Sequence, residues 1–577
     1  MSSAGGADGS GLAVDLRDDF WAPRVAQLRD HTLPVMLERL ERQGAIDAFR
    51  RLGGAQPRAE RRALWFSDSD VYKWMEAAAW AGRSDLLDPV IELVQAAARP
   101  DGYLHTFYDV GPGSPPRYGD LATSHEFYCA GHLVEAALAH HAVTGDDALL
   151  TIARRWADHQ CDTFGPGRDE RVDGHPEAEL ALARLAHHTG EERYLDQARW
   201  LVERQLTVAG RSIDDVDLAG HAVKVLYLAT GIAEIATATE DIRWMEATER
   251  LFATLVEQRS YPTGAVGGRW IDESVGKPFE LPDAMAYAES CAAVASVRFC
   301  RRVWDLTADP RALDQIELLL YNAVPCGVGA DGESWFYSQP QAVPDVAPES
   351  NPWVTPFEYG PSMLLSWFPA RRHRWFDVAC CPPNLGRMFA TVHHHVAEVA
   401  PSGDLTIHLP LAARLTGAGW DVEVASVHPE PGAVTVTVHE QPGSAELNLR
   451  IPGWAGGTGH RSLPPDGRVD LTTPPAWWET DRRVEGAAGT VFLRHGPVVH
   501  CVEGLDAPGT DLRELVVDPT QPPAVAFSRV APGGSLPLHR PAGPRPGAEP
   551  APDIATVPYH SWANRGLTTM RVRFPRR

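Results

Sequence analysis

The chain has 577 residues, 44% of them hydrophobic and 22% charged, a globular composition long enough for one large domain and one or two smaller ones. Its 53 basic and 76 acidic residues give a net charge of −23, which disfavours nucleic acid as a partner because phosphates would be repelled. No run of eighteen apolar residues predicts a membrane span, and the polar start of the chain has no secretory signal pattern, so we expect a cytoplasmic protein with no membrane partner.

Residues 1–17 are predicted to form a flexible N-terminus, and residues 18–400 to form a helical domain. In this domain apolar residues recur every three or four positions in stretches rich in alanine and leucine. Similar short connectors recur at intervals of about 45–70 residues, and each interval is the length of one helical hairpin with its loops. This repeat indicates stacked helix pairs. These connectors are Thr144-Gly145-Asp146-Asp147, Thr189-Gly190-Glu191-Glu192, Thr239-Glu240-Asp241 and Thr307-Ala308-Asp309. A closed ring of helix pairs, an (α/α) barrel, fits this pattern.

Three histidines, His125, His175 and His221, stand in strings that resemble helix starts or loop ends. A single histidine of this kind is usually structural or exposed. Because the three begin successive predicted hairpins, they would converge at one end of a ring.

The next chemical candidates are Glu273 and the string Glu289-Ser290-Cys291, sixteen positions apart. Pro278 and Pro282 exclude one continuous helix between them, so the segment must loop and can bring both carboxylates to one pocket. Glu289 would stand in the non-helical lead-in to a helix. Taken alone, Glu273 would be read as a solvated loop glutamate.

The most unusual string is Cys380-Cys381-Pro382-Pro383-Asn384. Its two prolines predict an extended, rigid exit with no helix directly after the thiols. Thiolates together with a carboxylate are suitable zinc ligands. The spacing alone is a weak signal, because it lacks paired Cys-x-x-Cys units, and buried inert cysteines are the alternative. The eight cysteines of the chain show no disulfide framework, which favours reduced thiols.

Beyond residue 400 the hydrophobic period changes to two, in Asp421 to Val424, Ala433 to Val438 and Ala445 to Ile451. This alternation predicts half-buried antiparallel strands, and we assign residues 401–577 to a β-sandwich accessory region. The stretch from Ala531 to Pro552, rich in proline and glycine, is predicted to be an irregular loop. The closing segment from Val557 to Phe574 is predicted to pack back on the sheet.

Taken together, these strings resemble glycoside hydrolase family 127, the β-L-arabinofuranosidases, and the similarity runs almost end to end. The strings that carry it include Asp68-Ser69-Asp70-Val71-Tyr72-Lys73-Trp74, His125-Glu126-Phe127-Tyr128, Tyr287-Ala288-Glu289-Ser290-Cys291, Cys380-Cys381-Pro382-Pro383-Asn384 and Val557-Pro558-Tyr559-His560-Ser561-Trp562.

The resemblance implies an (α/α)6-barrel catalytic domain with β-sandwich domains and a retaining exo-glycosidase that releases β-linked L-arabinofuranose or a related furanose. It implies one Zn²⁺ held by Glu289, Cys291, Cys380 and Cys381. Cys380 would be the nucleophile and Glu273 the acid/base, and His125, His175 and His221 would line the sugar pocket. The family's usual Gly-Glu-Ala-Phe-Gly appears here as Asp272-Glu273-Ser274-Val275-Gly276, which leaves the identity of the sugar open.

Two other readings stay open on the sequence. One is a sugar epimerase or lyase on the same barrel, which needs no nucleophilic cysteine. The other is a non-catalytic carbohydrate-binding protein with a structural zinc, because closed four-ligand sites are usually structural. The partner expected in the catalytic reading is a small oligosaccharide or arabinofuranoside, and formation of a homodimer is left open.

Overall fold

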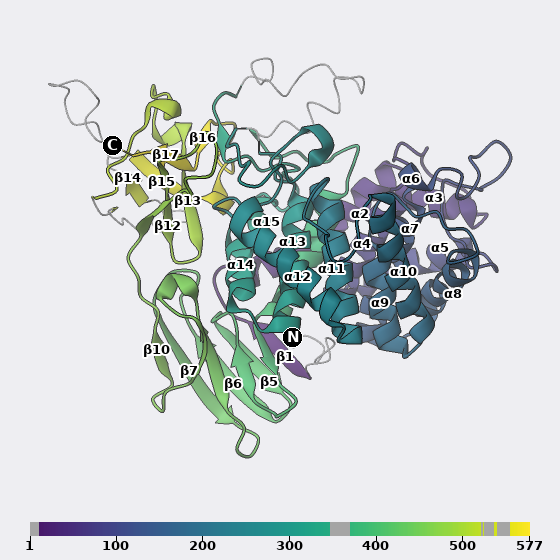
Figure 1. Cartoon of the computed structure of the whole chain (residues 1–577), viewed down its shortest axis with the longest axis horizontal. Helices are drawn as coiled ribbons and strands as arrows, with labels where there is room; N and C mark the ends of the chain where they lie inside the picture. Colours follow the sequence, from purple (N-terminus) through teal and green to yellow (C-terminus); the bar gives the residue numbers. More distant parts are fainter. Residues whose placement is uncertain are drawn as a thin grey trace.

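A ring of helices forms the larger part of the molecule (Figure 1), in a computed structural model that describes residues 11–284, 286–346, 370–520, 523, 536–538 and 554–576. Within these residues each inner helix packs against the next, and the last packs against the first, which closes the ring. The six inner helices are α4 (Asp68–Trp80), α7 (Glu126–Thr144), α9 (Ala178–Thr189), α11 (Ala222–Thr239), α13 (Ser290–Thr307) and α17 (Cys381–Ala390).

The inner helices are buried on nearly all sides, so they carry apolar and small residues around their whole circumference. Gly131 in α7 illustrates the close packing, because a Cβ there would lie 2.7 Å from the Cγ of Glu177 and 2.9 Å from the backbone nitrogen of Ala178. Helix α11 is also the one described helix long and apolar enough to cross a membrane, and 67% of its window is buried inside the protein, as expected of a core helix.

Outer helices alternate along the chain with the inner ones and bury one face each. They are α2 (Leu33–Arg42), α5 (Ser84–Ala97), α8 (Ala148–Thr163), α10 (Glu192–Val208), α12 (Ile242–Thr254) and α14 (Pro310–Tyr321). Each outer helix packs on an inner neighbour, so the predicted (α/α)6 barrel is confirmed. Shorter helices complete it: α1 (Trp21–Gln27), η1 (Leu28–Thr32), α3 (Ala45–Leu52), α6 (Leu121–Ser124), η2 (Leu255–Arg259), η3 (Ile271–Glu273), α15 (Ala323–Cys326) and η5 (Val392–His395).

The connectors recognised in the sequence are the hairpin turns of the barrel. In the first, Thr144 Oγ1 donates to the carbonyl of His140 at 2.7 Å and accepts from the backbone nitrogen of Asp146 at 3.1 Å. Thr189, Thr239 and Thr307 repeat this arrangement. The next residue in each connector is left-handed, which ends the inner helix.

Two β regions pack beside the barrel (Figure 1). The first contains a five-stranded sheet ordered β1-β5-β6-β7-β10 and a four-stranded sheet ordered β3-β4-β8-β9, in which β4 and β8 pair in parallel. The strands predicted from alternation are confirmed as β6, β7 and β8. The bounds are β1 (Leu12–Leu16), β3 (Ala397–Val399), β4 (Leu405–Ile407), β5 (Ala413–Gly417), β6 (Trp420–Ala425), β7 (Ala433–Glu440), β8 (Leu447–Ile451), β9 (Gly459–Ser462) and β10 (Arg468–Asp470), with η6 (Gly453–Ala455).

Strand β1 corrects one expectation, because Leu12–Leu16 was assigned to a flexible N-terminus. It pairs antiparallel with β5, from Leu12 opposite Gly417 to Leu16 opposite Ala413. Leu12 and Val14 are buried, so a half-buried edge position stabilises the segment. Residues 1–10 of the predicted N-terminus lie outside the described residues.

The second β region is an eight-stranded sheet whose main path is β11-β12-β13-β15-β14, with β16, β17 and β2 attached. The closing segment of the chain packs back on it as predicted, whereas most of the predicted loop at 531–552 lies outside the described residues. The bounds are β2 (Ala342–Val343), β11 (Ala476–Glu479), β12 (Thr490–His495), β13 (Val498–Glu503), β14 (Leu536–Leu538), β15 (Ile554–Pro558), β16 (Met570–Arg571) and β17 (Arg573–Pro575), with η7 (Gly504–Asp506), η8 (Leu512–Glu514) and η9 (Tyr559–Ser561). Its core joins Tyr559 and Trp562 to Phe336 of the preceding region. The predicted domain limits after residues 17 and 400 stay predictions.

Candidate catalytic and metal site

Two helix starts bring four candidate metal ligands together. Glu289 immediately precedes α13 with extended backbone, φ −62° and ψ 140°, and Cys291 lies in the first turn of that helix. Cys380 immediately precedes α17, and Cys381 is its first residue. The predicted position of Glu289 in a non-helical lead-in is therefore confirmed.

The prediction that Pro382 and Pro383 exclude a helix after the thiols is wrong. Both prolines lie in the first turn of α17. There the backbone nitrogen has no partner within the helix, so a missing N–H costs nothing, and the fixed φ of proline suits the helix. The prolines therefore start the helix, and its N-terminus faces the thiols.

The ligand atoms of Glu289, Cys291, Cys380 and Cys381 all lie within 4.8 Å of one another. The Sγ atom of Cys381 lies 3.5 Å from that of Cys291 and 3.8 Å from that of Cys380, too far for a disulfide. Oε1 of Glu289 lies 3.5 Å from the sulfurs of both Cys380 and Cys381. Sulfur and oxygen ligands at the corners of a zinc tetrahedron would lie about 3.5–3.8 Å apart, so the donor set fits such a site.

The electrostatics of this cluster favour a cation. Burial, followed by the neighbouring charge of Cys380, raises the pKa of Glu289 well above its ordinary value, and burial does the same for the pKa of Cys381. The hydrogen bond with Cys291 is the largest cause that raises the pKa of Cys380 to about 12. Burial raises the pKa of Cys291, but hydrogen bonds with Cys380 and Cys381 outweigh it and lower this pKa to about 6. Among the described residues, Oε2 of Glu289 is buried with no hydrogen-bond partner. Glu289, Cys380 and Cys381 resist ionisation beside Cys291 unless a cation compensates their charge.

A buried lysine lies close to the same cluster. Lys73 in α4 is fully buried, with its Nζ 3.0 Å from the hydroxyl of Tyr128 and 3.4 Å from Oδ1 of Asp70. Burial lowers the pKa of Lys73, but Tyr128, Asp70, Cys291 and Cys380 raise it further, so the ammonium form is retained. Lys73 thus supplies a fixed positive charge near the thiols. Lys73 belongs to one of the strings that resemble the family, but the sequence alone predicts no role for it.

Glu273 also lies close to Glu289. Its Oε2 is 2.6 Å from Nε2 of His221, and both residues fall within 4.8 Å of the Glu289 carboxylate. The loop is fixed by pairing of Ser274 with His221 and by a 3.0 Å bond from the nitrogen of Val275 to the carbonyl of Gly220. Glu273 has φ of 51°, a left-handed conformation held by this pairing. The prediction that this segment loops and brings the carboxylates of Glu273 and Glu289 together is confirmed.

The three predicted histidines converge as expected. The ring of His175 lies 5.4 Å from that of His125 and 5.9 Å from that of His221, measured between centroids. Nδ1 of His125 and Nδ1 of His175 donate to backbone carbonyls at 2.8 and 2.9 Å, so each Nε2 is left as an acceptor. Burial lowers the pKa of His125 to about 4, which keeps it neutral. His221 differs, because its Nδ1 accepts from the nitrogen of Val223, so its Nε2 carries the proton that Glu273 accepts.

Two tyrosines at this site were missed by sequence reasoning. The hydroxyl of Tyr337 lies 3.3 Å from the sulfur of Cys380, and the hydroxyl of Tyr287 is buried with no hydrogen-bond partner within the part of the chain that the structure describes. The charges of Glu273 and Glu289 act on both hydroxyl groups. Tyr287 adjoins the Glu289 string and was available as a signal, whereas Tyr337 stands in a segment without a helix or strand pattern.

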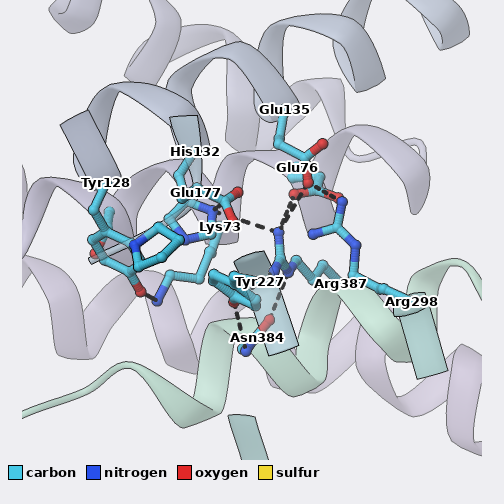
Figure 2. Close-up of polar contacts among 12 residues, drawn as sticks. Lys73, Glu76, Tyr128, His132, Glu135, Glu177, Tyr227, Arg298, Asn384 and Arg387 are labelled. Carbon is cyan, nitrogen blue, oxygen red and sulfur yellow. Dashed lines mark hydrogen bonds and ion pairs between the residues drawn. The ribbon is translucent and has the colours of Figure 1, made fainter. Parts of the chain in front are cut away.

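Beneath the site, a buried polar network anchors α17 (Figure 2). Arg387 lies 3.0 Å from Glu76 in α4 and 3.4 Å from Glu135 in α7, and it donates to the hydroxyl of Tyr227 in α11 at 3.0 Å. Its Nε donates to Asn384 at 2.6 Å. Because these partners come from different inner helices, the network fixes α17, and with it the two cysteines at its start.

The chain is similar to known proteins over almost its whole length. The model of the glycoside hydrolase family 127 β-L-arabinofuranosidase catalytic domain matches residues 13–394, and the model of the C-terminal domain of that family matches residues 475–575. The chain is 31% identical to a non-reducing end β-L-arabinofuranosidase of Bifidobacterium longum subsp. longum, over 98% of this chain and 100% of that protein. A solved family 127 β-L-arabinofuranosidase from Geobacillus stearothermophilus T6 superposes with a TM-score of 0.85 at 29% identity, covering 98% of this chain and 100% of that one. A solved family 127 β-arabinofuranosidase gives a TM-score of 0.85 at 26% identity, covering 98% and 96%.

Proposed function

The chain belongs to glycoside hydrolase family 127 and is a glycoside hydrolase, and on this premise we propose that it is a retaining exo-enzyme that releases β-linked L-arabinofuranose. In this proposal Cys380 is the nucleophile and Glu273 the acid/base. Glu289, Cys291, Cys380 and Cys381 hold one Zn²⁺. The β-L-arabinofuranosidase activity of its relatives supports the choice of sugar.

The observation that carries the proposal is the shared position of Glu289. Its carboxylate lies within 4.8 Å of a ligand atom of Cys380 and also within 4.8 Å of the carboxylate of Glu273. A retaining glycosidase needs a nucleophile and a proton donor about 5–5.5 Å apart on the two sides of one anomeric carbon. The closeness of Glu289 to both residues supports a thiol and a carboxyl group acting at one site.

In the first step, the thiolate of Cys380 attacks the anomeric carbon. A carbon–sulfur bond forms as the bond from that carbon to the aglycone oxygen breaks, and Glu273 gives its proton to the departing oxygen. In the second step, Glu273 as carboxylate takes a proton from water. The oxygen of that water attacks the same carbon, and the carbon–sulfur bond breaks to return the thiolate with net retention.

The residues around these two groups have supporting roles. Zinc, when bound, favours the thiolate form of its cysteine ligands at neutral pH. The N-termini of α13 and α17 and the ammonium group of Lys73 stabilise negative charge in the cluster. His221 donates to Glu273 and orients it. His125 and His175, neutral and with an acceptor nitrogen free, are suited to bind sugar hydroxyls.

The sequence left two alternatives open, a sugar epimerase or lyase and a binding protein without activity. Membership of a glycoside hydrolase family supports neither of them. The cytoplasmic location expected from the sequence stays a proposal. It is supported by the free state of all eight cysteines, which suits a reducing compartment.

The test is hydrolysis of a panel of p-nitrophenyl α- and β-L-arabinofuranosides and other pentosides, with the anomeric configuration of the first product followed by NMR. The proposal expects β-L-arabinofuranoside to be cleaved with retention. Preferential cleavage of another pentoside would refute the substrate, and inversion would refute the thiolate mechanism.

A further inference from the structure

We infer that the C-terminal β domain positions the catalytic centre through the strap formed by residues 335–343, with Tyr559 and Arg573 as positioning residues. The inference rests on the proposed roles of Cys380 and Glu273. It starts from contacts that neither the sugar pocket nor the metal ligands explain.

One side of the strap lies along the metal-ligand segment. The carbonyl of Tyr337 accepts from the nitrogen of Ser290 at 2.9 Å, and the side chain of Gln339 donates to Oγ of Ser290 at 2.8 Å. The nitrogen of Gln339 donates to the carbonyl of Ala288 at 3.1 Å. Glu289, between these residues, pairs with Ser338, and the hydroxyl of Tyr337 lies 3.3 Å from the sulfur of Cys380. Movement of the strap would therefore move a metal ligand and the neighbour of the nucleophile together.

The other side of the strap is held by the C-terminal domain. The buried hydroxyl of Tyr559 donates to the carbonyls of Gln339 and Pro340 at 3.0 and 3.1 Å. The nitrogen of Val572 donates to the carbonyl of Gln341 at 2.9 Å. The strap then continues as β2, which pairs with β16. The strap therefore connects the sheet of the C-terminal β domain to the active centre of the barrel domain.

The loop that carries Glu273 is fixed from the same domain. Arg573 donates to the carbonyl of Leu281 at 3.0 Å and to Oδ1 of Asp283 at 2.9 Å, and its side chain is 2% exposed. The carbonyl of Asp283 also accepts from the nitrogen of Gln341 at 2.9 Å, which ties the loop to the strap. Nearer Glu273, the guanidinium of Arg483 lies 4.0 Å over the ring of Phe279.

These contacts matter for rate because catalysis depends on the relative placement of sulfur, carboxyl group and sugar. A displacement of about 1 Å can lower a rate by about 100-fold without loss of the fold. Tyr559 contacts the strap beside Cys380 directly, whereas Arg573 contacts the loop that carries Glu273 directly, so the inference predicts that different kinetic defects dominate in the two variants.

The experiment compares Tyr559→Phe and Arg573→Lys in the full chain with matched controls. Tyr194→Phe removes the hydroxyl of a buried tyrosine that donates to Asp158 at 3.0 Å between two outer helices. Arg450→Lys changes a buried arginine that pairs with Asp314 and Glu317 away from the site. Each variant is assayed on arabinofuranosides with good and poor leaving groups, and its folded fraction is measured by thermal unfolding.

Tyr559→Phe is expected to lower kcat about tenfold with every leaving group while KM stays within about twofold. Arg573→Lys is expected to lower kcat more for poor leaving groups than for nitrophenol, because proton donation is displaced. Arg483→Gln, at a side chain 65% exposed, should show the same dependence more weakly and does not threaten folding. If the loss follows the folded fraction, or if the variants match Tyr194→Phe and Arg450→Lys, the inference is overturned.

A second readout does not need activity. In zinc-free full-length protein, the rate at which iodoacetamide alkylates Cys380 is mapped by peptide mass spectrometry. Tyr559→Phe should change this rate at least about threefold, and Tyr194→Phe should leave it unchanged. An unchanged rate in both would overturn the inference even if the enzyme is active. A changed rate in a protein that does not cleave arabinofuranosides would refute only the proposed substrate.

Discussion

Replacement of Arg387 by methionine should destabilise the protein far more than removal of a surface arginine. Methionine fills the same space but leaves the buried carboxylates of Glu76 and Glu135 without this cation. Glu135 also pairs with Arg184 and Arg298, so Glu76 loses most. Removal of one partner from a buried ion pair costs about 3–5 kcal/mol, a large share of a total stability of about 5–15 kcal/mol. Because Arg387 lies in α17, the loss should also loosen the two cysteines at the start of that helix.

The assay is urea unfolding, compared by midpoint, for Arg387→Met, Glu76→Gln and the double variant. The control is Arg414→Met, which removes an arginine 42% exposed and paired with Asp421, where solvent screening leaves little change in stability to expect. In the double variant, neutral glutamine replaces the stranded carboxylate, so part of the stability should return. The reasoning is refuted if Arg387→Met lowers stability no more than Arg414→Met does. It is also refuted if Glu76→Gln lowers the stability of the Arg387→Met protein by as much as it lowers that of the unmodified protein.

Three further predictions concern the proposed chemistry. Metal analysis of the purified protein should find one zinc per chain. Removal of the zinc by a chelator should abolish activity until zinc is returned. Full activity with far less than stoichiometric zinc would contradict this prediction. Glu273→Gln should lower kcat/KM by about 10²–10⁴-fold for poor leaving groups and much less for nitrophenol, which leaves without a proton; equal, mild losses would assign the acid elsewhere. Cys380→Ala should leave a folded protein that binds sugar but turns over at least about 10³-fold more slowly, whereas Cys381→Ser should mainly weaken zinc retention. An arabinofuranosyl inactivator should leave one pentose-sized adduct on Cys380, and an adduct on a carboxylate would refute the thiolate mechanism.

The barrel was predictable because its signals are local. Four of the hairpins carry a threonine that bonds back to its own helix with a left-handed residue after it, and these four short connectors recur in the sequence. The convergence of His125, His175 and His221 followed from the same regularity, because equivalent positions of successive hairpins meet at one end of a ring. The closeness of Glu289 to Cys380 depended on the family resemblance, because no spacing relates two helix starts 91 residues apart.

Other features were predicted wrongly or missed because their signals in the sequence are ambiguous, short or absent. Pro382 and Pro383 suit both an extended exit and a first helical turn, and only the surrounding packing selects between them. Strand β1 is five residues long, and its partner lies about 400 positions away, so alternation at Leu12 and Val14 was too short a signal. Tyr337 and the strap have no period at all, because their backbone bonds are satisfied by Ala288, Ser290 and a sheet of another domain.

The position of α17 as the helix that closes the ring has a consequence for how the enzyme is made. During synthesis α4 leaves the ribosome early. The side of α4 that packs on α17 then stays exposed until residues 381–390 emerge. At about 5–20 residues per second this interval lasts roughly 15–60 s. Because Cys380 and Cys381 stand at the start of that same helix, a chain released early lacks both the helix that closes the ring and the proposed nucleophile. Such incomplete chains would lack the thiol that the proposed mechanism requires.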